Sequence, residues 1–199
     1  MTDLTHAIQF FQTAFTILLG LALGEGFKQF VPDGDKDIIW DRSPSLLAFL
    51  FMIFPFFHGM SQYFYKVYLV HPDARLGPVA GRIMFDAMIF MTESALFFVL
   101  SRSLSTSHWV RFYFSLLALL VVDSVWVGVS ICFGAPLLPW LILNGILAAV
   151  LIVVLIKCFP RTPYSDTNRA PGAPSWICAG MTFATTVASY VWMKDFYFP

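Results

Sequence analysis

Six long apolar stretches, separated by short polar segments, run along the 199-residue chain. Each has about the 20 residues that an α-helix needs to cross the hydrocarbon core of a bilayer. Stretches of this length are typical of membrane-spanning helices, whereas strands are shorter and often alternate between apolar and polar positions. We therefore expect an all-α polytopic integral membrane protein, a single domain built as a bundle of about six transmembrane helices. The predicted spans are residues 7–30, 46–70, 80–101, 109–134, 137–158 and 175–194.

The composition changes this picture little and excludes several classes of protein. Hydrophobic residues make up 58% of the chain and charged residues 12%, whereas a soluble globular domain is roughly 25% charged. The formal net charge is zero, so no basic surface points to nucleic acid. Cys132, Cys158 and Cys178 form no paired motif, and we expect buried thiols rather than a disulfide framework or a metal site.

Ionisable side chains inside the spans are the most informative feature of the pattern. Asp86 and Glu93 lie in the third predicted span, seven residues apart, which places both on one face of a helix. Asp123 lies near the middle of the fourth span. A charged acid at the centre of a spanning helix costs about 2.5–3.5 kcal/mol on insertion scales. The three acids are therefore candidates for an ion or ligand pathway.

Three neutral or weakly basic polar residues join the acids as candidates for this pathway. His58 lies about as deep in the second span as Asp123 does in the fourth. Gln62 follows His58 by four residues and shares its helix face. Asn144 lies in the fifth span, about two turns from the bilayer centre on the side of the termini.

The predicted spans carry no Lys or Arg at the depth of these acids. Arg82 and Arg111 lie near the ends of their spans, and we expect both side chains to reach water at the membrane surface. Four ways of stabilising the acids are then open. The carboxyl groups are protonated, they pair with His58, they hold a proton or metal ion, or they contact a hydrated cavity.

A stripe of polar and small residues follows one face of the first span. The members of this α-helical stripe recur every three or four residues: Gln9, Thr13, Thr16, Gly20 and Gly24. Gly20 and Gly24 match the spacing that lets two membrane helices approach closely, and Ala22 and Gly26 repeat that spacing. The stripe is expected either to pack against another helix, including one from a second copy in a homo-oligomer, or to line a pore.

The distribution of positive charge predicts an orientation. An even number of spans places both termini on one side of the membrane. Of the 12 Lys and Arg residues, eight fall on the loops of the opposite side and four on the side of the termini. Because positively charged loops stay preferentially in the cytoplasm, we expect both termini outside it. The chain is compatible with a bacterial inner membrane.

The sequence lacks the motifs of several membrane functions. It contains no Gly-Tyr-Gly potassium filter, no arginine-rich voltage sensor, no HExxH zinc motif, no G-x-S-x-G nucleophile motif and no P-loop. A membrane haem needs paired axial histidines, and only His58 lies deep in a span. No cofactor is therefore expected, and an enzyme is the less favoured class.

We expect a small channel or transporter for protons or small cations, acting as a homo-oligomer in the lipid bilayer. Glu93 and Asp123 would attract or carry the cation, and His58 would pair with them. Two alternatives stay open. One is a membrane-embedded enzyme or small-ligand receptor with a His/Glu/Asp pocket. The other is a non-catalytic subunit of a larger membrane complex, whose acids only join its helices.

Overall fold

The computed structural model describes residues 2–31, 40–70, 79–104, 109–158 and 172–198, and in these ranges the regular structure is helical throughout. The long helices are α1 (Thr2–Phe30), α2 (Ser43–Phe64), α3 (Val79–Ser103), α4 (Trp109–Cys132), α5 (Leu138–Cys158) and α6 (Gly172–Trp192). The short ones are the 3-10 turn η1 (Trp40–Arg42), the π-helical segment η2 (Tyr65–Val70) and α7 (Lys194–Tyr197).

Each predicted span falls on one long helix, with ends that differ by a few residues, and the second span continues from α2 over η2. The expectation of an all-helical fold is thus confirmed. In the described part of the chain, the five helices α1 to α5 are long and apolar enough to cross a membrane. Helix α6 is 21 residues long but carries more hydroxyl and small side chains. The count of six spans therefore stays a prediction.

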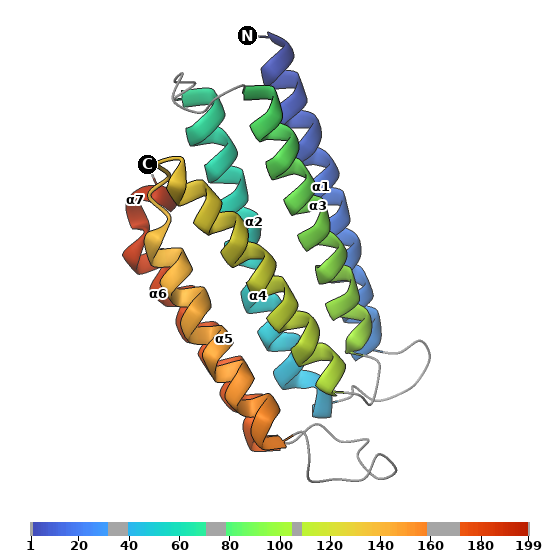
Figure 1. Ribbon diagram of the computed structural model, residues 1–199. Coiled ribbons are helices and arrows are strands. Elements are labelled where there is room, and N and C mark those ends of the chain that lie inside the picture. The colour runs from blue at the N-terminus through green and yellow to red at the C-terminus, as the bar shows by residue number, and fades with distance from the viewer. Residues whose placement is uncertain (1, 32–39, 71–78, 105–108, 159–171, 199) are drawn as a thin grey trace.

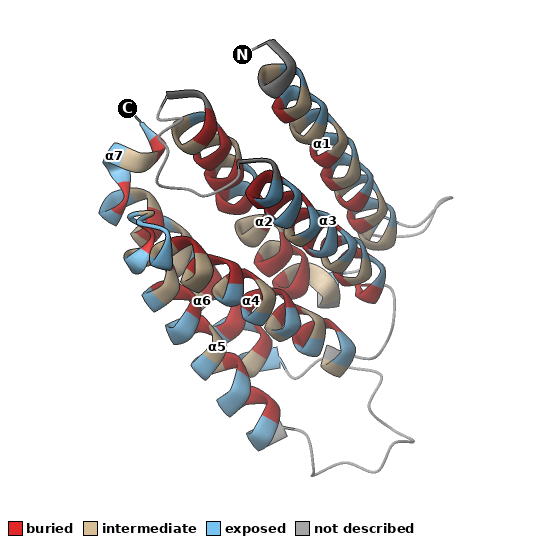
Figure 2. Ribbon diagram, turned by 45° about the horizontal axis from the view of Figure 1, so that its top comes forward, coloured by how far each residue is buried: buried red, intermediate tan, exposed pale blue. Residues whose placement is uncertain are grey.

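The six long helices run alternately up and down, so that the two ends of the chain lie at the same end of the bundle (Figure 1). Helix α1 packs mainly against α3, α2 packs against α6, and α4 packs against both α3 and α5. Buried faces turn toward the middle of the bundle, and exposed faces turn outward (Figure 2). Lys36, Arg75, Arg161 and Arg169, which contribute to the predicted orientation, lie outside the described residues.

Aromatic side chains fill much of the interior. The ring of Phe90 on α3 lies 6.0 Å from that of Phe15 on α1 and 4.9 Å from that of Trp126 on α4, measured between centroids. Phe56 on α2 lies 5.6 Å from Phe15. Helices in lipid associate through close van der Waals packing rather than through the hydrophobic effect. These ring contacts therefore supply cohesion between α1, α2, α3 and α4.

A proline in the middle of α2 creates a polar tie to α6. Pro55 has no backbone N–H, so the carbonyl of Phe51, four residues earlier, loses its helical partner. The hydroxyl of Thr186 on α6 donates a hydrogen bond to this carbonyl at 2.7 Å. Satisfaction of a freed carbonyl by a threonine from a neighbouring helix is one way in which membrane helices tolerate proline. The tie fixes the register of α6 on α2.

Candidate functional site

The first buried acid, Asp86, is held in a group of side chains that we call the Asp86 cluster: Asp86, Arg82, Tyr63, Tyr68 and Trp126. The Tyr68 hydroxyl donates to Asp86 Oδ2 at 2.5 Å, and the Trp126 indole Nε1 donates to Oδ1 at 2.9 Å. Arg82 Nη2 donates to the Tyr63 hydroxyl at 2.7 Å, and Arg82 Nε lies 4.0 Å from Asp86 Oδ2. Both oxygens of this acid and its charge are therefore partnered.

The position of Arg82 corrects one expectation from the sequence. Its side chain does not reach out to water but is buried, with the guanidinium carbon 4.6 Å from the centre of the Phe133 ring. The reason is local: Asp86 follows one turn later on α3, so the two side chains share a face. Arg111 is exposed, as expected. The π-helical segment η2 carries Tyr68 and so presents its hydroxyl to Asp86.

The second acid, Asp123, is held from α5. Its Oδ2 accepts a hydrogen bond from Trp140 Nε1 at 2.8 Å and one from Asn144 Nδ2 at 2.5 Å. Trp140 and Asn144 are four residues apart on α5, so both donors reach the same oxygen. Asp123 Oδ1 is buried and has no hydrogen-bond partner among the described residues. One oxygen of this carboxylate is thus satisfied and the other is free.

A glycine on α2 makes room for this arrangement. The indole of Trp140 crosses so close to Gly59 that a Cβ atom at this position would clash with the ring. The ring cannot move away without drawing its Nε1 from Asp123. Gly59 is therefore the residue whose missing side chain allows Trp140 to reach the acid.

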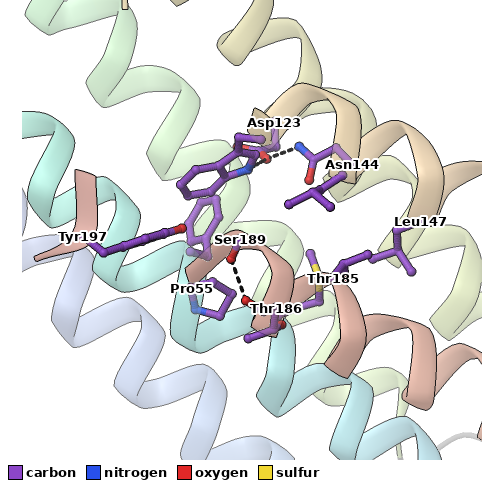
Figure 3. A pocket seen from close by; sticks show the side chains of 12 residues that line it. Pro55, Asp123, Asn144, Leu147, Thr185, Thr186, Ser189 and Tyr197 are labelled. Atoms are coloured by element: carbon purple, nitrogen blue, oxygen red, sulfur yellow. Dashed lines mark hydrogen bonds between the residues drawn. The ribbon is translucent and has the colours of Figure 1, made fainter. Parts of the chain in front are cut away.

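A cavity of about 40 Å³ borders Asp123, between α2, α4, α5, α6 and α7 (Figure 3). We call this space the Asp123 cavity. Its polar lining residues are Asp123, Asn144, Thr185, Thr186, Ser189 and Tyr197, and most of the remaining wall is apolar: Met52, Pro55, Phe56, Trp140, Leu143 and Leu147. A water molecule needs roughly 10–15 Å³ of such space, and drug-sized ligands need roughly 300–1,000 Å³. The cavity thus has room for a few waters or a small ion.

The C-terminal helix α7 contributes Tyr197 to the lining of this cavity. Tyr197 reaches in from α7, and its hydroxyl has no hydrogen-bond partner among the described residues. Burial raises the pKa of this hydroxyl above its ordinary value, so it is a neutral phenol at physiological pH. The Lys66 ammonium, on η2, donates to the carbonyl of Asp195 at 2.6 Å. This bond fastens α7 to the end of α2.

The third acid, Glu93, differs from the other two. Its side chain is fully buried on α3, and neither carboxyl oxygen has a hydrogen-bond partner in the described part of the chain. Asp123 and Asp86 both lie close enough to act on it electrostatically. Both of these neighbours are acids, and Arg82 on the same helix is engaged with Asp86 and Tyr63. Of the three buried acids, Glu93 is the one to which the described residues offer no hydrogen bond.

The structure does not bring His58 to these acids. The ring of His58 is half-buried among aromatic rings of α6 and the C-terminal segment, with centroids 5.1 Å from Tyr197, 5.6 Å from Phe198 and 5.7 Å from Tyr190. Gln62, one turn later, has a buried Oε1 without a partner among the described residues. Of the six candidate pathway residues, the structure joins Asp123 to Asn144 by a hydrogen bond and leaves His58 apart.

The stripe on α1 faces outward. Its five residues, Gln9, Thr13, Thr16, Gly20 and Gly24, are exposed, and Cβ atoms added to the two glycines would meet nothing within 4 Å. The side of α1 that packs in the bundle instead carries Ala22 and Gly26, where a Cβ on Gly26 would lie 3.1 Å from the Phe49 ring. Within one copy of the chain, the stripe therefore lines no interior path.

Sequence reasoning missed the donors that hold the acids. Tyr68, Trp126 and Trp140 were not among the candidate residues, and Arg82 was assigned to the membrane surface. One signal was present: Trp126 and Trp140 carry polar N–H groups and lie three residues after Asp123 and four residues before Asn144, respectively. An indole inside a span needs an acceptor, and an unpaired acid is the obvious one.

Comparison of the chain with protein-family models, with curated proteins and with solved structures finds no match. Among the described residues, no group of three or more His, Cys, Asp and Glu side chains is assembled to hold a metal ion. The functional argument therefore rests on the geometry of the acids and of the Asp123 cavity.

Proposed function

We propose that the protein is a small integral membrane transporter or channel for protons or small cations, and that Glu93 and the Asp123 cavity form its pathway. The observation that carries the proposal is the contrast along α3. Asp86 has an arginine and two hydrogen-bond donors, whereas Glu93, two turns away, is fully buried without a partner among the described residues.

The cost of this arrangement favours a role in transport. A charged acid in the middle of a span is unfavourable by about 2.5–3.5 kcal/mol even on insertion scales. An acid retained only to join helices would recover this cost through hydrogen bonds, as Asp86 does. Glu93 makes none to the described residues. A group that exchanges a proton, or neutralises a passing cation, needs to remain free of permanent partners.

The size of the Asp123 cavity weighs against an enzyme or receptor that holds an organic ligand beside Asp123. About 40 Å³ is far below the roughly 300–1,000 Å³ of pockets that bind drug-sized molecules. The space suits water, a hydronium ion or a single metal cation. The third class, a subunit whose acids only lock the helices together, accounts for Asp86 but leaves the isolation of Glu93 unexplained.

Two further proposals complete this function. Helix α6 spans the membrane as a sixth crossing, supported by its length of 21 residues and by its position alongside α2 and α5. The exposed stripe on α1 packs against the same stripe of a second copy, because small residues and hydroxyls let two helices approach closely in lipid.

Flux measurements test the proposed function. The purified protein is reconstituted into liposomes, and internal pH is followed under an imposed potential, with sodium and potassium gradients in parallel. We expect flux in the wild type and its loss in Glu93→Gln and in Asp123→Asn. Glu25→Gln, the same chemical change near the end of α1, is the matched control and should keep full flux. Unchanged flux in both pathway variants would refute the assignment.

A further inference from the structure

We propose that a groove between α5 and α6 binds one anionic phospholipid, with an acyl chain along the groove and the headgroup phosphate at Lys157. The groove has a volume of about 420 Å³ and shares no described lining residue with the Asp123 cavity. This inference goes beyond the proposed function. It rests on the membrane insertion of α5 and α6 that the proposed function includes, but not on ion transport.

The walls of the groove suit a hydrocarbon chain. One face of α5 forms one wall, and the first turns of α6 form the other. The apolar lining residues that the structure describes are Ala149, Val150, Val153, Val154, Pro174 and Ile177, and the one polar side chain among the described lining is Lys157. Such walls offer no hydroxyl, amide or acid to orient a soluble polar ligand, whereas an acyl chain needs only van der Waals contact.

The groove has a fixed shape and opens outward. Valine and isoleucine are branched at Cβ, so their χ1 angles are nearly fixed in a helix. Val153 and Ile177 are about half exposed, at 49% and 54%, so the groove faces the surroundings of the bundle rather than its core. Binding to a surface that is already formed costs little conformational entropy. In a bilayer, the molecules on this side of α5 and α6 are lipids.

The dimensions weigh against a helix from a second copy or a partner as the occupant. The α5 wall runs from Ala149 to Lys157, which is about 12 Å at 1.5 Å per residue. A spanning helix would need a matching surface over about 30 Å. A helix about 10–12 Å across would also occupy on the order of 1,000 Å³ over 12 Å of its length, which is more than the groove offers. A single acyl chain is a much narrower occupant.

Charge complementarity selects an anionic lipid. Lys157 is exposed in the last turn of α5, and no carboxylate in the described ranges forms an ion pair with it. A lysine at the end of a span lays its stem along apolar surface and places its ammonium among the headgroups. Lys28, Arg102 and Arg111 lie at the same end of the bundle, which the predicted orientation turns toward the cytoplasm. The cytoplasmic leaflet is rich in anionic lipids, and basic pockets between helices on that side bind their headgroups.

Native mass spectrometry of the full-length protein in detergent tests the proposal. Phosphatidylglycerol and phosphatidylcholine with identical oleoyl chains are titrated in parallel, so that only the headgroup differs. We expect phosphatidylglycerol to bind more tightly, at one site per chain. Lys157→Gln should weaken its binding about fivefold, the contribution of one lysine at an anionic membrane surface. Lys28→Gln, the same change at another exposed position of this end, is the control and should keep wild-type binding.

A second pair of variants tests the groove itself. Val153→Trp fills the groove with an indole and should weaken the binding of both lipids. Val121→Trp, at an exposed position of α4 outside the described lining, is the matched control and should leave both unchanged. Excess soluble glycerol phosphate should not displace the bound lipid, because the acyl chain makes most of the contact.

The outcomes separate this inference from the proposed function. Equal binding of the two lipids, or equal losses in Lys157→Gln and Lys28→Gln, would overturn the headgroup site. Lipid binding that Val153→Trp leaves unchanged would overturn the groove, and displacement by glycerol phosphate would show a soluble phosphate site instead. None of these results alters the expected ion flux. Absence of flux together with the expected lipid binding would refute the transport proposal and leave the lipid site standing.

Discussion

Two acids on one helix face show how neighbouring residues set the role of a side chain. Asp86 and Glu93 are both buried on α3, and the sequence treats them alike. Asp86 accepts hydrogen bonds from Tyr68 and Trp126 and lies 4.0 Å from Arg82. Glu93 has no hydrogen-bond partner among the described residues. We therefore expect substitutions at the two positions to separate stability from transport.

Asp86→Asn should destabilise the protein by about 3–5 kcal/mol, because it removes the charge that compensates a buried arginine and turns an acceptor into a donor. Glu93→Gln should change stability little, since it breaks no hydrogen bond. Thermal unfolding in detergent, followed by circular dichroism, measures both. Equal loss of stability in the two variants would show that Glu93 is also held by structure, against the role proposed for it.

At the residue scale, the sequence was sufficient to find the acids and insufficient to find their partners. Asp86, Glu93 and Asp123 stand out because a charge inside an apolar span is rare. Their donors come from other helices, and which helices meet depends on packing that no local pattern encodes. The expectation for Arg82 was wrong for this reason. Its position near the end of a span fits a side chain at the membrane surface, whereas its contacts with the buried Asp86 and Tyr63 hold it inside the bundle.

At the scale of elements, α6 is attached to α2 by a polar contact at a proline. The Phe51 carbonyl, deprived of its helical donor by Pro55, is satisfied by Thr186. Helix α6 carries fewer large apolar side chains than α5, so its position depends more on such specific contacts. Thr186 also lines the Asp123 cavity, which connects the docking of α6 to the geometry of the site.

Thr186→Val should cost about 1–3 kcal/mol, because it leaves the Phe51 carbonyl buried without a donor while keeping the side-chain volume. Thr185→Val is the matched control. The Thr185 hydroxyl bonds carbonyls of its own helix that already take part in helical hydrogen bonding, so its loss should cost less. Thermal unfolding of the two variants gives the comparison, and an equal shift in both would contradict the tie.

Helix positions were predictable, and irregularities within helices were not. The hydrophobic pattern places all six long helices to within a few residues because length and apolar content are local properties of the chain. The π-helical segment Tyr65–Val70, by contrast, continues a helix with one wider turn. It accompanies two contacts made by its own residues: Lys66 with the Asp195 carbonyl and Tyr68 with Asp86. Those contacts are long-range, so the pattern gives no sign of them.

At the scale of the whole molecule, the number of crossings determines where the two ends lie. The six long helices place both termini at one end of the bundle (Figure 1). Single cysteines at the exposed positions His6, Lys157 and Lys194, in a background without native cysteines, test this in intact cells with an impermeant maleimide. We expect the cysteines placed at His6 and Lys194 to label from outside the cell and the cysteine placed at Lys157 to be protected. If the cysteines placed at Lys157 and at Lys194 both label, α6 does not cross the membrane.

The outward stripe on α1 predicts the state of association. Gly20→Ile combined with Gly24→Ile should separate the copies, because the larger side chains prevent close approach of two α1 helices. Leu21→Ile, an apolar exchange at an exposed neighbouring position, should leave association unchanged. Light scattering of the protein–detergent complex measures the mass. A wild-type monomer, or an oligomer that survives the double substitution, would contradict the predicted interface.

The order of the helices along the chain also has a consequence for biosynthesis. Asp86 is synthesised after Tyr68 and close to Arg82, so part of its environment already exists when α3 leaves the ribosome. Asp123 is different, since both of its donors, Trp140 and Asn144, lie on α5, which the ribosome makes later. A nascent chain that ends after α4 therefore carries an acid with neither of these two donors. The wall of the Asp123 cavity is the last part of the bundle to assemble, because it is complete only when α5, α6 and α7 are in place.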